Sequence, residues 1–133
     1  MPIAGNAAMR AADAMLRALG GEEIALVLPL AGETPDLSSQ LGLSDPGAQR
    51  VPIFPVVVRN LPAPASGPAQ RREFLLSAAA IANAVQEQGA SSAQALLDAT
   101  LAVEYQGTLY HIESGTADYF AGTAYLYRLI AVE

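Results

Sequence analysis

The sequence predicts an α+β fold: a small antiparallel β-barrel or curled sheet of five to six strands, with an N-terminal helix and two short helices. Short alternating or β-branched runs recur along the chain, turn-rich connections separate several of them, and no β-α-β alternation is present. A chain of 133 residues, of which 52% are hydrophobic, is expected to be a single domain over residues 1–133.

The first element is a helix over residues 6–19, followed by Gly20-Gly21 as its stop signal. Asn6 is the expected N-cap. One face of this helix carries apolar residues at helical spacing: Met9, Ala12, Leu16 and Leu19. The spacing therefore indicates a helix that packs one side against a core.

Three strands are expected in the next half of the chain, over residues 23–28, 51–59 and 72–76. Pro52 and Pro55 interrupt the second of these. Because proline cannot donate to a sheet ladder, we expect this strand to lie at an edge or to begin irregularly.

Two helices should follow the third strand. Ser77 can cap a helix over residues 78–88, which Gly89 ends. Ser91, with Gln94 three residues later, fits a capping box that opens a second short helix.

The C-terminal third predicts a β-hairpin and a final strand. Runs over 101–105 and 108–113 flank Gln106-Gly107, a tight turn. Residues 114–123 are expected to form a connection before a last strand over 124–132, which is apolar on both faces and so should be covered on both.

Residues 29–50 predict a long connection that contains many turn signals. We expect it to be flexible in isolation and ordered against a partner, the alternative being a tolerated insertion without a role. The candidate interface combines this connection with the last strand: Glu33, Asp36, Leu37, Leu41, Leu43, Tyr125, Tyr127 and Arg128.

The composition argues against several kinds of chemistry. The formal net charge is −6 and the sequence has no lysine, which disfavours binding to a nucleic-acid backbone. The five tyrosines lack interleaved basic residues, so we interpret them as core or interface residues rather than base-stacking platforms. No run approaches the roughly 20 apolar residues of a membrane span.

No catalytic, cofactor-binding or metal-binding residues are predicted, and we expect the protein not to be an enzyme. Cysteine is absent, and His111, the single histidine, has no nucleophile or further ligands at a recognisable spacing. The carboxylates likewise do not repeat at the spacing of a metal loop.

The C-terminal run AVEYQGTLYHIESGTADYFAGTAYLYRLIAVE resembles the closing segment of small head-tail joining (head completion) proteins of tailed bacteriophages and prophages. In that family a turn of the form x-G-x-x-Y-x-I precedes a loop and a final strand. The matching positions are Gly107, Tyr110 and Ile112, then residues 125–129. The runs MLRALGGEEIALVLP, QLGL and VPIFPVVVR also resemble the N-terminal halves of short phage neck proteins.

The resemblance implies a non-enzymatic structural protein of a virion, which forms a homo-oligomeric ring with other neck or tail proteins as partners. It implies a location in the cytoplasm of the bacterial host and then in the virion. Residues 77–99 depart from the family, because their two helices are longer than a minimal barrel needs.

Two alternatives remain open. One is a small-ligand-binding barrel of bacterial origin, with Tyr105, Tyr110 and Tyr125 around its mouth. A filled barrel interior would count against it. The other is an enzyme with dispersed acidic residues, which would need carboxylates that converge on His111.

Overall fold

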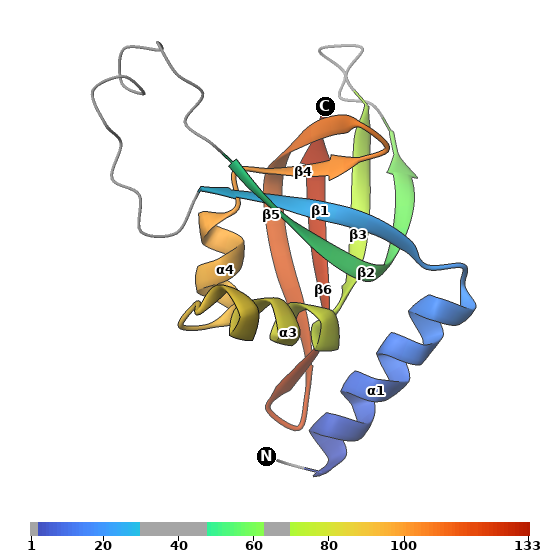
Figure 1. The fold of residues 1–133 in the computed structure, drawn as a ribbon. Helices are drawn as coiled ribbons and strands as arrows, with labels where there is room; N and C mark the ends of the chain where they lie inside the picture. Colours follow the sequence, from blue (N-terminus) through green and yellow to red (C-terminus); the bar gives the residue numbers. More distant parts are fainter. Residues whose placement is uncertain (1–2, 30–47, 63–69) are drawn as a thin grey trace.

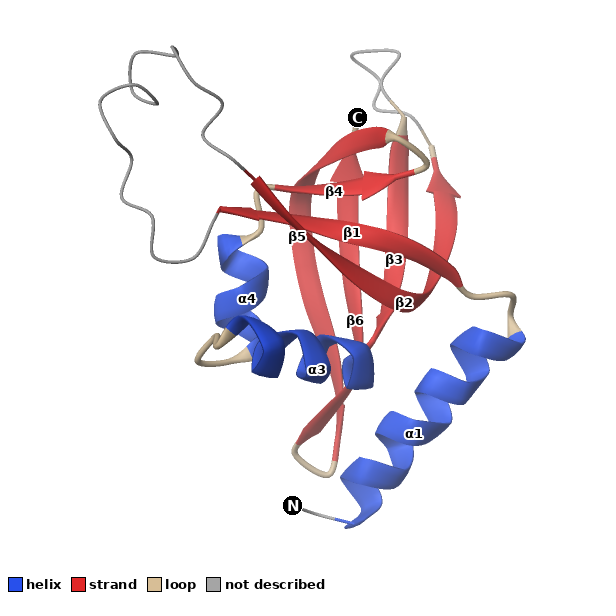
Figure 2. Ribbon diagram, viewed as in Figure 1, coloured by secondary structure: helices blue, strands red, loops and turns tan. Residues whose placement is uncertain are grey.

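A computed structural model describes residues 3–29, 48–62 and 70–133, and these ranges contain six strands and three helices (Figures 1 and 2). Their bounds are α1 Ile3–Ala18, β1 Glu22–Pro29, β2 Ala48–Leu61, β3 Arg71–Ser77, α3 Ala78–Gln88, α4 Ala93–Ala99, β4 Ala102–Tyr105, β5 Thr108–Phe120 and β6 Thr123–Val132.

The six strands close into an antiparallel barrel in the order β1-β2-β3-β6-β5-β4. The expected α+β barrel with an N-terminal helix and two short helices is therefore confirmed. Closure follows from the pairing of β1 with both β2 and β4, which gives every described strand two neighbours and leaves no open sheet edge.

The barrel interior is filled by apolar side chains that alternate along the strands. The largest of those exposed by less than 2% come from all parts of the sheet and from α3: Phe74, Leu26, Ile53, Leu76, Ile81, Leu129, Val56 and Val103. This one continuous core holds the six strands together.

The two prolines of β2 lie where that strand has one neighbour. Residues 48–53 pair with β1 alone, whereas pairing with β3 begins at Val56. A register shift in the β1 pairing spans Pro55. Of the two alternatives expected, an edge strand is wrong for β2 because the barrel closes, whereas an irregular first part agrees with this register shift. Pro52 and Pro55 nevertheless lie in the part where a missing N–H costs no hydrogen bond to β3.

Helix α1 lies along one end of the barrel and buries Ala12 and Leu16 against it (Figure 1). It begins at Ile3, so Asn6 lies inside the helix and is not its N-cap. Leu19, expected on the apolar face, lies beyond the helix end and is 65% exposed.

Ser77 joins α1, β3 and α3. Its hydroxyl donates to Asp13 Oδ1 at 2.6 Å and accepts from the Ala80 N–H at 3.3 Å, and the residue is fully buried. Burial by itself would raise the pKa of the Asp13 carboxyl. The hydrogen bond from Ser77 and the ion pair with Arg17 outweigh that effect and lower this pKa.

The predicted helix over 78–88 is confirmed, with Gly89 in the left-handed conformation at its end. Helix α4 begins one residue later than the capping box suggested. Ser92, and not Ser91, accepts a hydrogen bond from the Ala95 N–H at 3.1 Å. Two adjacent serines offer the same side chain, so the local sequence does not distinguish them.

The predicted connection over 114–123 is wrong. Strand β5 runs on to Phe120 and pairs with β6 almost throughout, and the turn falls at Ala121-Gly122. Gly115 lies inside this strand. In the barrel it lies opposite Leu129, and a Cβ added there would stand 3.0 Å from Leu129 Cδ2. Glycine fits this close approach, so the strand continues.

The long connection is shorter than 29–50, because Pro29 belongs to β1, residues 48–50 belong to β2, and Pro29 pairs with Ala48. Five of the interface candidates lie outside the described residues: Glu33, Asp36, Leu37, Leu41 and Leu43.

Candidate functional site

His111 lies exposed on β5. Within residues 3–29, 48–62 and 70–133, no group of three or more His, Asp or Glu side chains could hold a metal ion. The convergence of carboxylates on His111 that an enzyme would need is therefore not found among these residues.

Five of the seven arginines form ion pairs, and four of these pairs join different strands of the barrel. The pairs are Arg17–Asp13 (2.8 Å), Arg50–Glu104, Arg59–Glu73 (3.1 Å), Arg71–Glu113 (3.3 Å) and Arg128–Asp118 (3.0 Å). The positive charge of these five arginines is locally compensated by carboxylates.

Tyr105 and Tyr110 pack inside the barrel against Phe74. The ring centroids lie 5.8 and 5.7 Å from that of Phe74, both edge to face. The two tyrosines are only 7% and 3% exposed. Two of the three tyrosines expected around the mouth of a ligand-binding barrel, Tyr105 and Tyr110, are therefore part of the packed core, whereas Tyr125 is partly buried on β6.

The hydroxyls of both tyrosines have partners. Tyr105 donates to Glu22 Oε1 at 2.8 Å, and Arg72 Nε donates to the Tyr110 oxygen at 2.9 Å while its guanidinium lies over both rings. Burial first, and then the hydrogen bond to Glu22, raises the pKa of Tyr105. The arrangement is typical of a satisfied core and provides no activated group.

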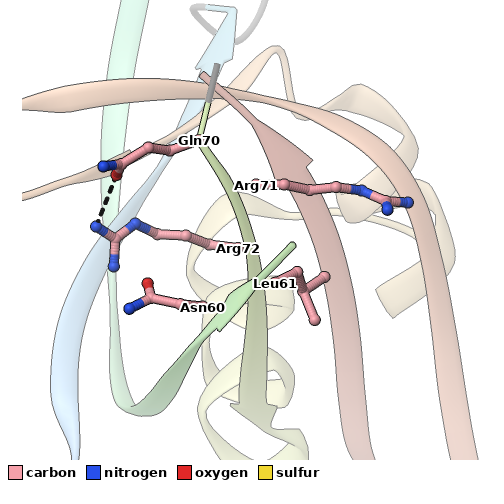
Figure 3. Close-up of a pocket in the computed structure, with 5 residues that line it drawn as sticks. All are labelled: Asn60, Leu61, Gln70, Arg71 and Arg72. Atoms are coloured by element: carbon pink, nitrogen blue, oxygen red, sulfur yellow. Dashed lines mark hydrogen bonds between the residues drawn. The ribbon is translucent and has the colours of Figure 1, made fainter. Parts of the chain in front are cut away.

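A cleft of about 260 Å³ lies beside this cluster, at the ends of β2 and β3 (Figure 3). It is lined by Asn60, Leu61, Gln70, Arg71 and Arg72. Both cations are already engaged: Arg72 also donates to Gln70 Oε1 at 3.0 Å, and Arg71 pairs with Glu113. The charge of Arg71 is compensated by Glu113, whereas Arg72 has hydrogen bonds to neutral oxygens and no ion pair with a described carboxylate.

The most exposed aromatic side chains lie at the turn between β5 and β6, residues 119–122, which we call the hairpin tip. Tyr119 is 68% exposed and Phe120 is 54% exposed. The tip projects past the barrel beside the start of α1 (Figure 1). Two adjacent exposed aromatic rings on a projecting turn are typical of a contact with another protein. The sequence interpretation missed them because it placed them in a connection.

An apolar pocket of about 250 Å³ lies where β1 ends against α3 and α4, and we call it the α4 pocket. Its lining is apolar except for Gln88: Leu28, Pro29, Ala90, Ala95, Leu96 and Ala99. Small side chains on α4 leave the hollow, since alanine does not fill the space that a larger residue would.

Three of the interface candidates can be placed on β6. Tyr125, Tyr127 and Arg128 are all partly buried. Tyr127 packs against the core, and burial followed by the nearby Tyr119 raises its pKa. Arg128 pairs with Asp118 of β5. Tyr127 and Arg128 therefore have contacts within the chain, and the role of all three residues at an interface stays a prediction.

Comparison with protein-family models, with curated proteins and with solved structures finds no match for this chain. None of the helices in the described ranges has the length and apolar character needed to span a membrane.

Proposed function

We propose that this chain is a non-enzymatic assembly component that joins a virion head to its tail as part of a homo-oligomeric ring. The observation that supports this best is the pairing of a filled barrel with exposed aromatic residues. Phe74, Tyr105 and Tyr110 occupy the interior, whereas Tyr119 and Phe120 face outward. Apolar side chains pack the interior of the barrel in the described residues, and the exposed aromatic rings at the surface are the candidates for contact with a partner.

The bacteriophage part of the proposal comes from the resemblance of the C-terminal hairpin and final strand to head-tail joining proteins. In this role the protein would occupy the cytoplasm of the bacterial host before it enters the virion, with neck or tail proteins as partners. The described arginines support an interaction with protein rather than DNA, since five of them pair with carboxylates.

The test is the solution mass by light scattering over a concentration series, alone and mixed with candidate neck and tail proteins. Rings, or monomers that become rings when a partner is added, are the expected result. A monomer at every concentration that binds none of these proteins would rule the proposal out.

The role of residues 30–47 can be tested separately. Because Pro29 and Ala48 pair across the sheet, an Asn-Gly turn can replace residues 30–47 without disturbing either strand. We expect this variant to keep its circular dichroism spectrum and thermal midpoint but to fail in an assay of head completion. Normal head completion would remove this segment from the interface.

A further inference from the structure

We infer that the cleft at the ends of β2 and β3 binds a single carboxylate group through the guanidinium of Arg72. This inference goes beyond the proposed function and does not depend on it.

The positive charge of Arg72 has no paired carboxylate among the described residues. Arg72 shares this property with Arg10, but Arg10 is exposed on α1, whereas Arg72 is partly buried at the end of the barrel. Glu22 accepts the hydrogen bond of Tyr105 and forms no ion pair with Arg72. Residues 63–69, which link β2 to β3 in the sequence, contain no Asp or Glu. A partly desolvated cation gains more from an added anion than an exposed one does, because water screens it less.

The guanidinium of Arg72 is held in place within the chain. Its Nε donates to the Tyr110 oxygen at 2.9 Å, and its Nη2 donates to Gln70 Oε1 at 3.0 Å. Its Cζ lies 5.4 Å from the ring centroid of Tyr105 and 5.8 Å from that of Tyr110. The N–H groups that remain without a described partner are therefore on the two terminal nitrogens. Since the side chain is already ordered, a ligand would lose little free energy in ordering it.

Two amide side chains flank this guanidinium. Asn60 is paired with Arg72 in the register of β2 and β3. Figure 3 shows the side chains of Asn60, Gln70 and Arg72 extending to one side of the two strands, whereas those of Leu61 and Arg71 extend to the other. Asn60 is exposed, and its side chain has no hydrogen bond with a described residue. Its amide can therefore donate to a ligand oxygen beside Arg72.

Charge and shape favour a carboxylate over a phosphate group. The terminal nitrogens of a planar guanidinium can contact both oxygens of a carboxylate at once. One cation balances the single charge of a carboxylate, whereas a phosphate group carries about 1.5 to 2 negative charges near pH 7. Arg71 adds no free charge, because it is paired with Glu113.

The size of the cleft limits what can carry the carboxylate. The cleft measures about 260 Å³, and a cavity of about 150 Å³ holds a benzene molecule. It therefore has room for a small organic acid or for the end of one acidic side chain of another protein. Both present the same group to Arg72.

The test is an NMR titration of the isotope-labelled full chain, with the side-chain Nε–Hε signal of Arg72 as the readout. Benzoate represents a small acid, and glutamate blocked at both ends represents a protein side chain. Chloride and inorganic phosphate at matched ionic strength are the controls. We expect a saturable shift with at least one carboxylate, a weaker response to phosphate and none to chloride. Tighter binding of benzoate assigns the group to a small molecule, and tighter binding of blocked glutamate assigns it to a protein partner.

Three variants locate the binding. Arg72→Gln should weaken carboxylate binding at least about tenfold. Arg10→Gln is the matched control, since it removes the other arginine without a described ion pair, and it should bind as the unmodified chain does. Asn60→Ala should weaken binding about threefold. Because Asn60 is exposed, this variant should keep its fold even if Arg72→Gln does not.

The inference is overturned if neither carboxylate gives a saturable shift, or if phosphate binds more tightly than both. It is also overturned if a folded Arg72→Gln variant binds as well as Arg10→Gln. If Arg72→Gln does not fold, unchanged binding by Asn60→Ala overturns it. Light scattering decides the proposed function separately: a chain that forms rings but binds no carboxylate keeps that proposal and loses this one, and a monomer that binds a carboxylate does the reverse.

Discussion

The barrel interior and the hairpin tip use the same kinds of side chain in opposite ways. Inside, Phe74 contacts two tyrosines edge to face, and each tyrosine hydroxyl has a hydrogen-bond partner. At the tip, Tyr119 and Phe120 are more than half exposed. Buried aromatic rings with satisfied hydroxyls stabilise a fold, while exposed adjacent rings are available to another molecule. The difference separates the residues that stabilise this protein from those that let it bind.

The largest difference in stability is expected between two variants that each lose one aromatic ring, one in the barrel interior and one at the hairpin tip. Phe74→Ala leaves a cavity at the centre of the core and should lower the free energy of unfolding by about 3–5 kcal/mol. Phe120→Ala should change it by no more than about 0.5 kcal/mol. Urea unfolding followed by circular dichroism measures both. Equal losses would mean that the tip is part of the stabilising core.

A smaller loss is expected at the junction of α1 with the barrel. Ser77→Ala removes the cap of α3 and the hydrogen bond to Asp13, which should cost about 1–3 kcal/mol. The same unfolding measurement checks it. Ser91→Ala is the control, because Ser91 caps neither α3 nor α4.

The hydrogen bond and ion pair of Asp13 at this junction predict that the free energy of unfolding depends on pH. The folded-state pKa of Asp13 lies below its unfolded value, near 3.8. Its ionised form therefore stabilises the fold above that value, and the contribution is lost as the pH falls through the lower folded pKa. Asp13→Asn should be less stable than the unmodified chain at about pH 6 and approach it at about pH 3. A constant difference over this range would contradict the assignment.

Removing one tyrosine hydroxyl from each of the two regions should give a smaller difference in stability. Tyr105→Phe removes the hydrogen bond to the half-buried Glu22 and should lower the free energy of unfolding by about 1 kcal/mol. Tyr119→Phe removes an exposed hydroxyl and should leave stability unchanged. Thermal unfolding of the two variants side by side decides whether burial accounts for the difference.

The local sequence predicted most of the elements because their signals are local. The strand predicted over residues 23–28, the cap at Ser77, the stop at Gly89 and the turn at Gln106-Gly107 each depend on residues next to one another in the chain. The α+β class followed from the order of these elements. The filled core also agrees with the alternation of apolar residues along the strands.

The tertiary structure decided what depends on distant residues. Closure of the barrel required β1 to pair with β4, more than seventy residues away in sequence, and no local pattern encodes that contact. Residues 114–120 became a strand because β6 provides a partner along their whole length, although their composition is typical of a connection.

The candidate binding surfaces also depend on contacts between residues that are distant in the sequence. Tyr119 and Phe120 end β5, in the hairpin that continues past the barrel (Figure 1), and the α4 pocket forms where β1 meets two helices. Sequence by itself determined which short segments are helical or extended, because propensity, caps and turns act over a few residues. Which of the tyrosines are buried and which are exposed was decided by strand pairing, since that alone sets how far each residue lies from the core.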